Sequence, residues 1–130
     1  MANELTVSGE NAVALSEQFD LGTLIKPLKQ EIHLFDTFIA GTTHLEDETP
    51  LKEIKVGDEL SLQREQNRFD DNAILILDAQ GRKLGYVPEK DNIIFARLMD
   101  AGKRLIGKIS KITPKAGLLQ ISIGIYLVDF

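Results

Sequence analysis

Alternating apolar and polar positions predict that the larger part of this chain folds into β-strands. In residues 59–64, Leu60 and Leu62 alternate with polar residues, which is the period of a strand that buries one face. Residues 73–77 are continuously apolar, as is typical of a short buried strand. Patterns of these two kinds predict six short strands, in residues 31–41, 59–64, 73–77, 83–87, 103–112 and 118–127.

Two segments between these strands carry helix signals. Thr49 is a predicted N-cap, and Pro50 is the first residue of a single helical turn over residues 50–54. Residues 89–101 predict a longer helix, which Gly102 ends. The stripe predicted to face the core consists of Ile94, Leu98 and Ala101, with Phe95 and Met99 beside it. Six strands, one short helix and one longer helix indicate a mainly β or α+β fold, either a small barrel or a sandwich.

The beginning of the chain has weaker signals. Residues 11–19 allow a short helix, and glycine and proline punctuate the surrounding sequence. Residues 1–10 lack both the basic start and the apolar stretch of a secretory signal, and no apolar run is long enough to span a bilayer. We therefore interpret residues 1–28 as a weakly structured extension and residues 29–130 as one folded domain.

Charge is distributed unevenly along a chain whose net charge is −5. Residues 1–81 contain 6 Lys and Arg against 16 Asp and Glu, whereas residues 82–115 contain 9 against 3. This basic segment either draws a polyanion to one face or simply solvates a helix and a strand. The absence of cysteine excludes disulfides and thiolate metal sites, and it fits a reducing compartment. We expect a cytoplasmic protein without a cofactor and without a membrane partner.

The sequence offers little support for catalysis. Of the two histidines, His33 and His44, neither has a serine or aspartate in a recognisable catalytic spacing. His44 and the acidic residues after it are better explained as a solvated turn than as a metal cluster, because consecutive side chains do not converge on one point. The same argument weakens Asp70 and Asp71 as the carboxylate pair of a metal-dependent nuclease. We therefore expect a protein that is not an enzyme.

Residues 64–72 form the polar segment with the most useful chemistry. Arg64 and Arg68 can pair with phosphate, and Phe69 offers a flat apolar face on which a base can stack. Asp70 can accept a hydrogen bond from a hydroxyl or amino group, and Asn67 can shape the loop through its own backbone. The alternative places Phe69 in the core and Asp70 in a turn, with a surface ion pair between Arg64 and its neighbour Glu65. Residue chemistry by itself favours this alternative.

Several spaced motifs, however, resemble one known family. Residues 57–65 read Gly-Asp-Glu-Leu-Ser-Leu-Gln-Arg-Glu, and residues 67–74 read Asn-Arg-Phe-Asp-Asp-Asn-Ala-Ile. Gly81 and the Leu-Gly-Tyr-Val-Pro of residues 84–88 follow, and Ile-Ala-Gly-Thr-Thr-His precedes them at residues 39–44. In this order the motifs resemble those of the HIRAN domain family, over residues 31–123.

This resemblance implies a small six-stranded β-barrel similar to the OB-fold. It also implies binding of single-stranded DNA, because eukaryotic HIRAN domains recognise a free 3′ end. An aromatic–aspartate pair there stacks a base and bonds the terminal hydroxyl, and it corresponds to Phe69 and Asp70. An arginine–aromatic pair that holds the strand corresponds to Thr43 and His44. Thr43 departs from the pattern, which implies weaker DNA binding or a different ligand unless other cations replace the arginine.

Two functional hypotheses follow from these observations. The first is a bacterial-type, stand-alone module that binds single-stranded DNA or its 3′ ends through seven residues and serves DNA repair. These residues are Thr43, His44, Arg64, Asn67, Arg68, Phe69 and Asp70. The second is a protein-interaction module that recruits a separate helicase, nuclease or other DNA-processing partner.

Overall fold

Six strands form one curled sheet in residues 30–129, the part of the chain that the computed structural model describes. Their bounds are β1 Gln30–Phe38, β2 Glu59–Arg64, β3 Ile74–Leu77, β4 Lys83–Tyr86, β5 Arg104–Lys115 and β6 Leu118–Asp129. The helical elements are the 3₁₀ turns η1 Thr42–His44 and η2 Glu89–Asp91 and the α-helices α3 Thr49–Glu53 and α4 Asn92–Asp100. The extension predicted for residues 1–28 lies outside the described residues.

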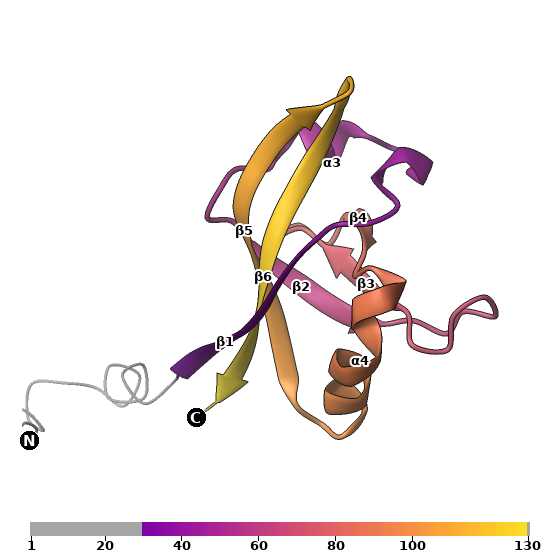
Figure 1. The fold of residues 1–130 in the computed structure, drawn as a ribbon, viewed down its shortest axis with the longest axis vertical. Helices are drawn as coiled ribbons and strands as arrows, with labels where there is room; N and C mark the ends of the chain where they lie inside the picture. The colour runs from indigo at the N-terminus through magenta and orange to yellow at the C-terminus, as the bar shows by residue number, and fades with distance from the viewer. Residues whose placement is uncertain (1–29, 130) are drawn as a thin grey trace, which may run out of the picture. The chain divides into compact units, whose positions relative to one another are not determined.

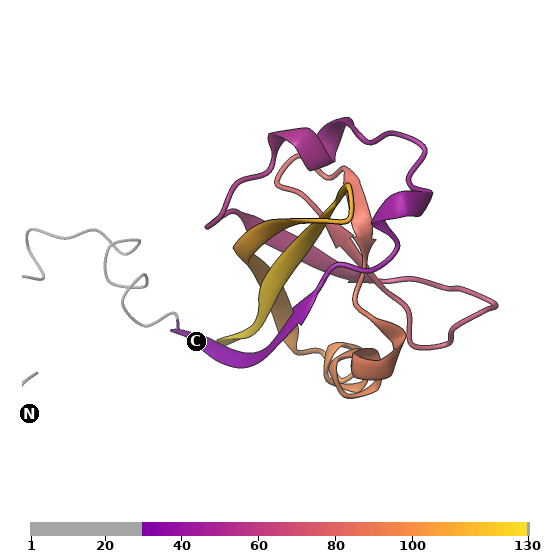
Figure 2. The ribbon, with the colours of Figure 1, turned by 45° about the horizontal axis from the view of Figure 1, so that its top comes forward.

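The strand order β1-β6-β5-β2-β3-β4 makes the sheet a half-barrel (Figures 1 and 2). Its two ends meet just beyond β1, where the Ala40 and Tyr86 backbones exchange two hydrogen bonds of 2.8 and 2.9 Å. Gly85 makes this approach possible, because a Cβ atom at that position would lie 2.3 Å from the Ala40 carbonyl oxygen. The predicted six-stranded barrel with a short and a longer helix is therefore confirmed.

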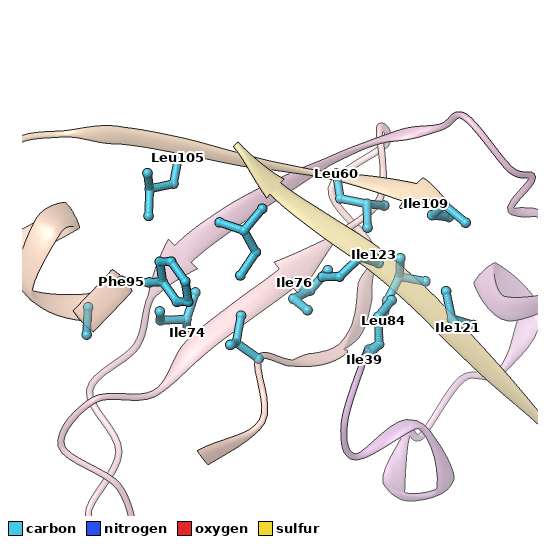
Figure 3. Packing of buried hydrophobic residues seen from close by; sticks show 13 residues of the cluster. Ile39, Leu60, Ile74, Ile76, Leu84, Phe95, Leu105, Ile109, Ile121 and Ile123 are labelled. Carbon is cyan, nitrogen blue, oxygen red and sulfur yellow. The ribbon is translucent and has the colours of Figure 1, made fainter. Parts of the chain in front are cut away.

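The core fills the inside of this curled sheet with side chains from alternate strand positions (Figure 3). Leu60 is buried while its neighbour Ser61 is exposed, as the alternation predicts. The fully buried side chains are dominated by branched aliphatic residues, each of which stabilises the fold by about 1.5–3 kcal/mol relative to leaving it exposed. The largest of them are Leu60, Ile74, Ile76, Leu84, Ile109, Ile121, Ile123 and Ile125.

The buried face of the longer helix differs from the predicted stripe. In α4, Phe95 and Ala96 are buried and the predicted Leu98 and Met99 pack against the core, whereas Ile94 is 66% exposed and Ala101 is also exposed. The helix is preceded by η2, whose Asp91 accepts a hydrogen bond from the Thr37 hydroxyl at 2.9 Å and thereby fixes how the chain enters α4. The centre of the buried face is therefore shifted by one residue along the sequence from the predicted stripe, and one residue corresponds to a rotation of about 100° around the helix axis.

Two boundaries also differ from prediction. The N-cap of α3 is Glu48 rather than Thr49, and the Thr49 backbone N–H donates a hydrogen bond to the Asp47 carboxylate at 2.9 Å. Strands β5 and β6 are not short: each has 12 residues, and a register shift between Ile109 and Lys111 interrupts their pairing. An irregularity of this kind increases local twist and lets long strands bend around a core. No helix in residues 30–129 is long and apolar enough to cross a membrane.

Candidate nucleic-acid interface

The segment of residues 65–73 connects β2 to β3 and projects away from the sheet (Figures 1 and 2). It holds its own shape through short-range hydrogen bonds. The Asn67 carboxamide oxygen accepts from the Phe69 N–H at 2.8 Å, and the Asp70 carboxylate accepts from the Asn72 N–H at 2.9 Å. Both are Asx turns, in which a side chain replaces a backbone acceptor. The predicted role of Asn67 in shaping this loop is confirmed.

Arg64 anchors the base of this loop. Its guanidinium donates to the Ala73 carbonyl at 2.6 Å, the Asp71 carbonyl at 2.8 Å and the Asp100 carboxylate at 2.9 Å. The surface ion pair expected with Glu65 is therefore replaced by one with Asp100 of α4. With these partners, Arg64 ties both ends of the loop to the helix and has little capacity left for a phosphate.

A second link joins the loop to α4. Asn92 is 1% exposed, and its side-chain amide donates to the Asp70 carboxylate at 2.8 Å. Each Asp70 oxygen therefore accepts one hydrogen bond from the protein, one from the Asn72 N–H and the other from the Asn92 amide, and each retains a further lone pair for a ligand. The expectation that Asp70 caps a turn is confirmed. This bonding also holds the carboxylate in one orientation.

Phe69 lies at the outer part of the same loop. Its side chain is 81% exposed, so the alternative that placed it in the core is wrong. The Arg68 guanidinium carbon is 5.0 Å from the Phe69 ring centroid, within the range of a cation–π contact. The loop therefore presents an aromatic ring and a cation side by side.

Phe69 and Asp70 line a pocket together with Ala40 and Tyr86, the residues at which the half-barrel closes. Its volume is about 260 Å³, and we call it the terminal pocket. Tyr86 forms part of its wall, and the Tyr86 hydroxyl donates to the Glu65 carboxylate at 2.7 Å. The lining consists of Ala40, Gly41, Asn67, Phe69, Asp70, Ala73, Tyr86, Val87 and Glu89.

The charges at the terminal pocket are mixed. Asp70 and Glu89 line it. Lys83 lies beside it, because its ammonium is 4.7 Å from the Tyr86 ring centroid and donates to the Tyr86 hydroxyl at 3.2 Å. A pocket with two acidic lining residues and an open aromatic ring suits a sugar hydroxyl and a base better than it suits a phosphate.

Thr43 and His44 do not line the terminal pocket. Both are exposed in η1, and His44 lines a separate pocket of about 520 Å³ together with Arg82 and Lys83. Thr43 lines a larger pocket of about 600 Å³, which we call the hairpin pocket because the β5–β6 hairpin forms one side of it. The terminal and hairpin pockets adjoin, since Ala40 and Gly41 line both.

The basic segment of residues 82–115 divides between structural and accessible cations. Arg82 pairs with Asp78 and Glu53, and Lys108 pairs with Glu31. Lys83, Lys90 and Lys115, by contrast, lie beside the terminal and hairpin pockets: Lys115 lines the hairpin pocket, and the Lys90 ammonium is 5.9 Å from the centroid of Phe38, another lining residue. Part of the basic segment thus faces the candidate interface.

Three residues of the site were not identified from the sequence. Tyr86 and Glu89 line the terminal pocket, and Asn92 orients Asp70. Tyr86 belongs to the Leu-Gly-Tyr-Val-Pro motif, so the motif that indicated the family also pointed to this residue. No local pattern marks Asn92, because its partner is distant in sequence. Within residues 30–129 no three His, Asp or Glu side chains are grouped so that they could hold a metal ion.

Comparison with known proteins identifies the class of this half-barrel. The model of the HIRAN domain family matches residues 32–128, and the chain belongs to this family. A crystal structure of a protein from Lactobacillus plantarum is 29% identical with a TM-score of 0.72, covering 78% of this chain and 99% of that one. The HIRAN domain of human HLTF is 16% identical with a TM-score of 0.62, covering 77% of this chain and 78% of that one. No curated protein matches.

Family membership bears on function at a general level. HIRAN domains are known as DNA-binding modules and are typically not catalytic. At 16% identity, the likeness to the human domain shows a shared fold.

Proposed function

We propose that this protein is a non-enzymatic module that binds single-stranded DNA and recognises its free 3′ end in the terminal pocket. The observation that carries the proposal is the 81% exposure of Phe69 on a loop tied to α4 at two points, by Arg64 and by Asp70. Exposing a large aromatic ring in water gains nothing for folding. A base stacked on the ring would bury that surface, a contact worth about 1–3 kcal/mol.

The preference for an end follows from the acidic residues of the terminal pocket. A 3′-hydroxyl can donate a hydrogen bond to an Asp70 oxygen that still has a lone pair. A phosphodiester or 3′-phosphate at the same place would bring its negative charge close to Asp70 and Glu89. A free 3′ end therefore combines an attractive contact with the absence of a repulsive one.

Fluorescence anisotropy with labelled single-stranded oligonucleotides of about ten nucleotides tests the proposal. We expect an oligonucleotide with a free 3′-hydroxyl to bind at least about tenfold more tightly than the same sequence with a 3′-phosphate, since a hydrogen bond to a charged group contributes about 1.5–3 kcal/mol. Equal affinity for the two ends would contradict end recognition, and no binding at low salt would contradict DNA binding altogether.

A substitution of Phe69 distinguishes stacking on the aromatic ring from non-specific binding. Phe69→Ala should weaken binding by roughly 5- to 150-fold, the equivalent of about 1–3 kcal/mol. Val56→Ala is the matched control, because Val56 is also a large exposed apolar residue, at 61%, but lies outside the terminal pocket. Its affinity should equal that of the unmodified protein.

A second function as a protein-interaction module is favoured by the surface of β1. This strand forms one edge of the sheet, and Ile32, Leu34 and Phe35 on it are 37–42% exposed. Exposed apolar residues on an edge strand suit an added strand or another apolar partner. A helicase or nuclease captured by the unmodified protein but not by Leu34→Ser would support this function and the predicted role in DNA repair.

A further inference from the structure

Exposed apolar side chains gather on two elements of this protein. Nine large apolar side chains are exposed in residues 30–129, and five of them lie on the strand β1 and the helix α4. Apolar area that is concentrated in this way marks an interaction surface, whereas single exposed apolar residues are ordinary. The five residues are Ile32, Leu34 and Phe35 on β1, and Ile93 and Ile94 on α4.

β1 and α4 contact each other through aromatic side chains. The ring centroids of Phe35 on β1 and Phe95 on α4 are 5.6 Å apart. Leu98 is four residues after Ile94 and three residues after Phe95, so these three side chains share one side of the helix, the side that meets β1. Both elements run along the lower edge of the view in Figure 2. Ile94 therefore continues on α4 the apolar surface that Phe35 begins on β1.

β1 also has a free backbone edge. Just after this strand, the Ile39 N–H donates to Ile121 of β6 at 2.9 Å, and the Ala40 N–H donates to Tyr86 of β4 at 2.8 Å. Successive residues of an extended chain bond to opposite sides, so the side of β1 away from β6 is the side that β4 closes at Ala40. Because β4 ends at Tyr86, no strand in residues 30–129 continues along this side of β1. Unpaired backbone groups of this kind are a template for an added strand.

The accessible charges on and after α4 are positive. Three cations of residues 91–104 are exposed and make no ion pair with another of the described residues; they are Arg97, Lys103 and Arg104. The two acidic residues of this stretch already have partners, because Asp91 accepts from the Thr37 hydroxyl and Asp100 pairs with Arg64. A partner that covers the apolar residues therefore meets positive charge beside them, which favours an acidic partner and disfavours a basic one.

We propose that β1 and α4 together form a docking surface for an acidic, extended segment of a partner protein, which adds as a strand to the free edge of β1. The backbone of this segment bonds to β1, its apolar side chains cover Phe35 and Ile94, and its carboxylates face Arg97. The surface is separate from the terminal pocket, whose lining includes no residue of β1 or α4. This inference rests on the second proposed function, protein interaction, and it adds the chemistry and conformation of the partner and the contribution of α4.

Selection from a displayed library of random peptides tests the chemistry of the partner. The library contains peptides of about ten residues, the length of a long strand, and the target is the unmodified full-length protein. We expect the selected peptides to contain more Asp and Glu than Lys and Arg, together with several apolar residues. Selected peptides without an excess of acidic residues would contradict the proposal.

Substitutions on α4 test where a selected peptide binds. Ile94→Ser should weaken binding of the labelled peptide roughly 5- to 30-fold, as is usual for a residue at the centre of an interface. Arg97→Glu should weaken it roughly 2- to 10-fold, and more at low salt than at high salt. Val56→Ser and Lys111→Glu are the matched controls, because both residues are exposed but lie outside β1 and α4, and neither should change the affinity.

Methylation of the peptide backbone tests the addition of a strand. A strand bonds to one neighbour through every second residue, so the two sets of alternate N–H groups in the peptide are not equivalent. N-methylation of one set should weaken binding at least about tenfold, while N-methylation of the other set should have a much smaller effect. Equal effects of the two methylation patterns would contradict strand addition.

The remaining outcomes separate this inference from the proposed functions. If Leu34→Ser weakens binding of the peptide but Ile94→Ser and Arg97→Glu do not, β1 binds a partner as proposed, and the inference about α4 is wrong. If no peptide is selected, the inference fails, while capture of a helicase or nuclease still tests protein interaction.

Two other occupants of the surface would also contradict the inference. A dimer in sedimentation analysis that Leu34→Ser converts to a monomer would show that a second copy of the chain occupies the edge. Weaker binding of Arg97→Glu to an oligonucleotide with a free 3′ end would show that nucleic acid occupies the surface. We expect neither result, and circular dichroism melting curves confirm that each variant is folded.

Discussion

The side-chain amide of Asn92, at the start of α4, donates a 2.8 Å hydrogen bond to the carboxylate of Asp70, 22 residues earlier in the chain. Asn92 is almost completely buried, whereas Asp70 faces a pocket. A rigid helix thereby orients a carboxylate on a projecting loop. Such a buried contact to an ionised group is worth about 1.5–3 kcal/mol.

Asn92→Ala should lower the free energy of unfolding by about 1–3 kcal/mol, because the Asp70 carboxylate oxygen that accepts from the Asn92 amide then loses its donor. It should also reduce the preference for a 3′-hydroxyl over a 3′-phosphate, since Asp70 is then held at one oxygen rather than two. Urea unfolding measures the first effect and anisotropy the second. A loss of stability with an unchanged end preference would show that Asn92 does not position Asp70.

Gly85→Ala should disrupt the closure of the half-barrel. The new Cβ atom would lie 2.3 Å from the Ala40 carbonyl oxygen and 2.6 Å from a methyl group of Ile39. Overpacking of this kind costs about 1–3 kcal/mol or more, and here it opposes the two hydrogen bonds between Ala40 and Tyr86. A lower melting temperature and faster amide hydrogen exchange at Tyr86 are the expected results.

Gly81→Ala is the control for this substitution. Gly81 has a positive φ of 82°, but nothing lies within 4 Å of a Cβ atom there. Its loss of stability should be limited to the cost of a left-handed alanine, about 1–2 kcal/mol. Gly85 also has a positive φ, 153°, so both variants include a cost of backbone strain. Equal losses would mean that this strain, rather than the contact with Ala40, explains the effect of Gly85→Ala.

Ala116→Asn should stabilise the β5–β6 hairpin. Ala116 has a φ of 51° and Gly117 a φ of 81°, so both turn residues are left-handed. Asparagine followed by glycine is the preferred pair in such a turn, because asparagine tolerates this conformation better than alanine. We expect a gain of about 0.5–1 kcal/mol in the free energy of unfolding, measured in urea. A decrease in stability would contradict this description of the turn.

Acid should destabilise the turn between β3 and β4. Burial acts to raise the pKa of Asp78, but hydrogen bonds from the Arg82 backbone and guanidinium and from the Gln80 N–H outweigh it, so the pKa of this carboxyl lies below its usual value. A depressed pKa in the folded state stabilises the protein above the unfolded value of about 3.9. This contribution is lost as the pH falls through the folded pKa.

Asp78→Asn should therefore lower the melting temperature at neutral pH and flatten its decrease between about pH 5 and pH 2. Asp71→Asn provides the comparison, because Asp71 is exposed and the Arg82 guanidinium bonds Asp78 and Glu53 instead. Parallel melting curves for Asp78→Asn and the unmodified protein across this pH range would show that another group controls acid unfolding.

Local patterns in the chain were sufficient for much of the fold. The alternation of apolar and polar residues placed the strands, because successive side chains of a strand point to opposite faces of the sheet, as Leu60 and Ser61 show. Loop composition likewise identified Asn67 and Asp70 as turn-forming residues. The longer helix was placed correctly, with Phe95, Leu98 and Met99 against the core, but Ile94 faces outward. The contact between Thr37 and Asp91 at the start of this helix joins residues 54 apart in the sequence, which no local pattern reveals.

The order of strands and the composition of the pockets were decided by tertiary structure. The residue type of Phe69 is compatible with a buried or an exposed position. Its exposure depends on how Arg64 and Asn92 hold the loop. Thr43 and Lys115 are far apart in the sequence, yet they line one pocket because β6 lies between β1 and β5 in the sheet. Residue types and spacings determined which chemistry is present in this protein, and long-range packing decided which of those groups face the same ligand.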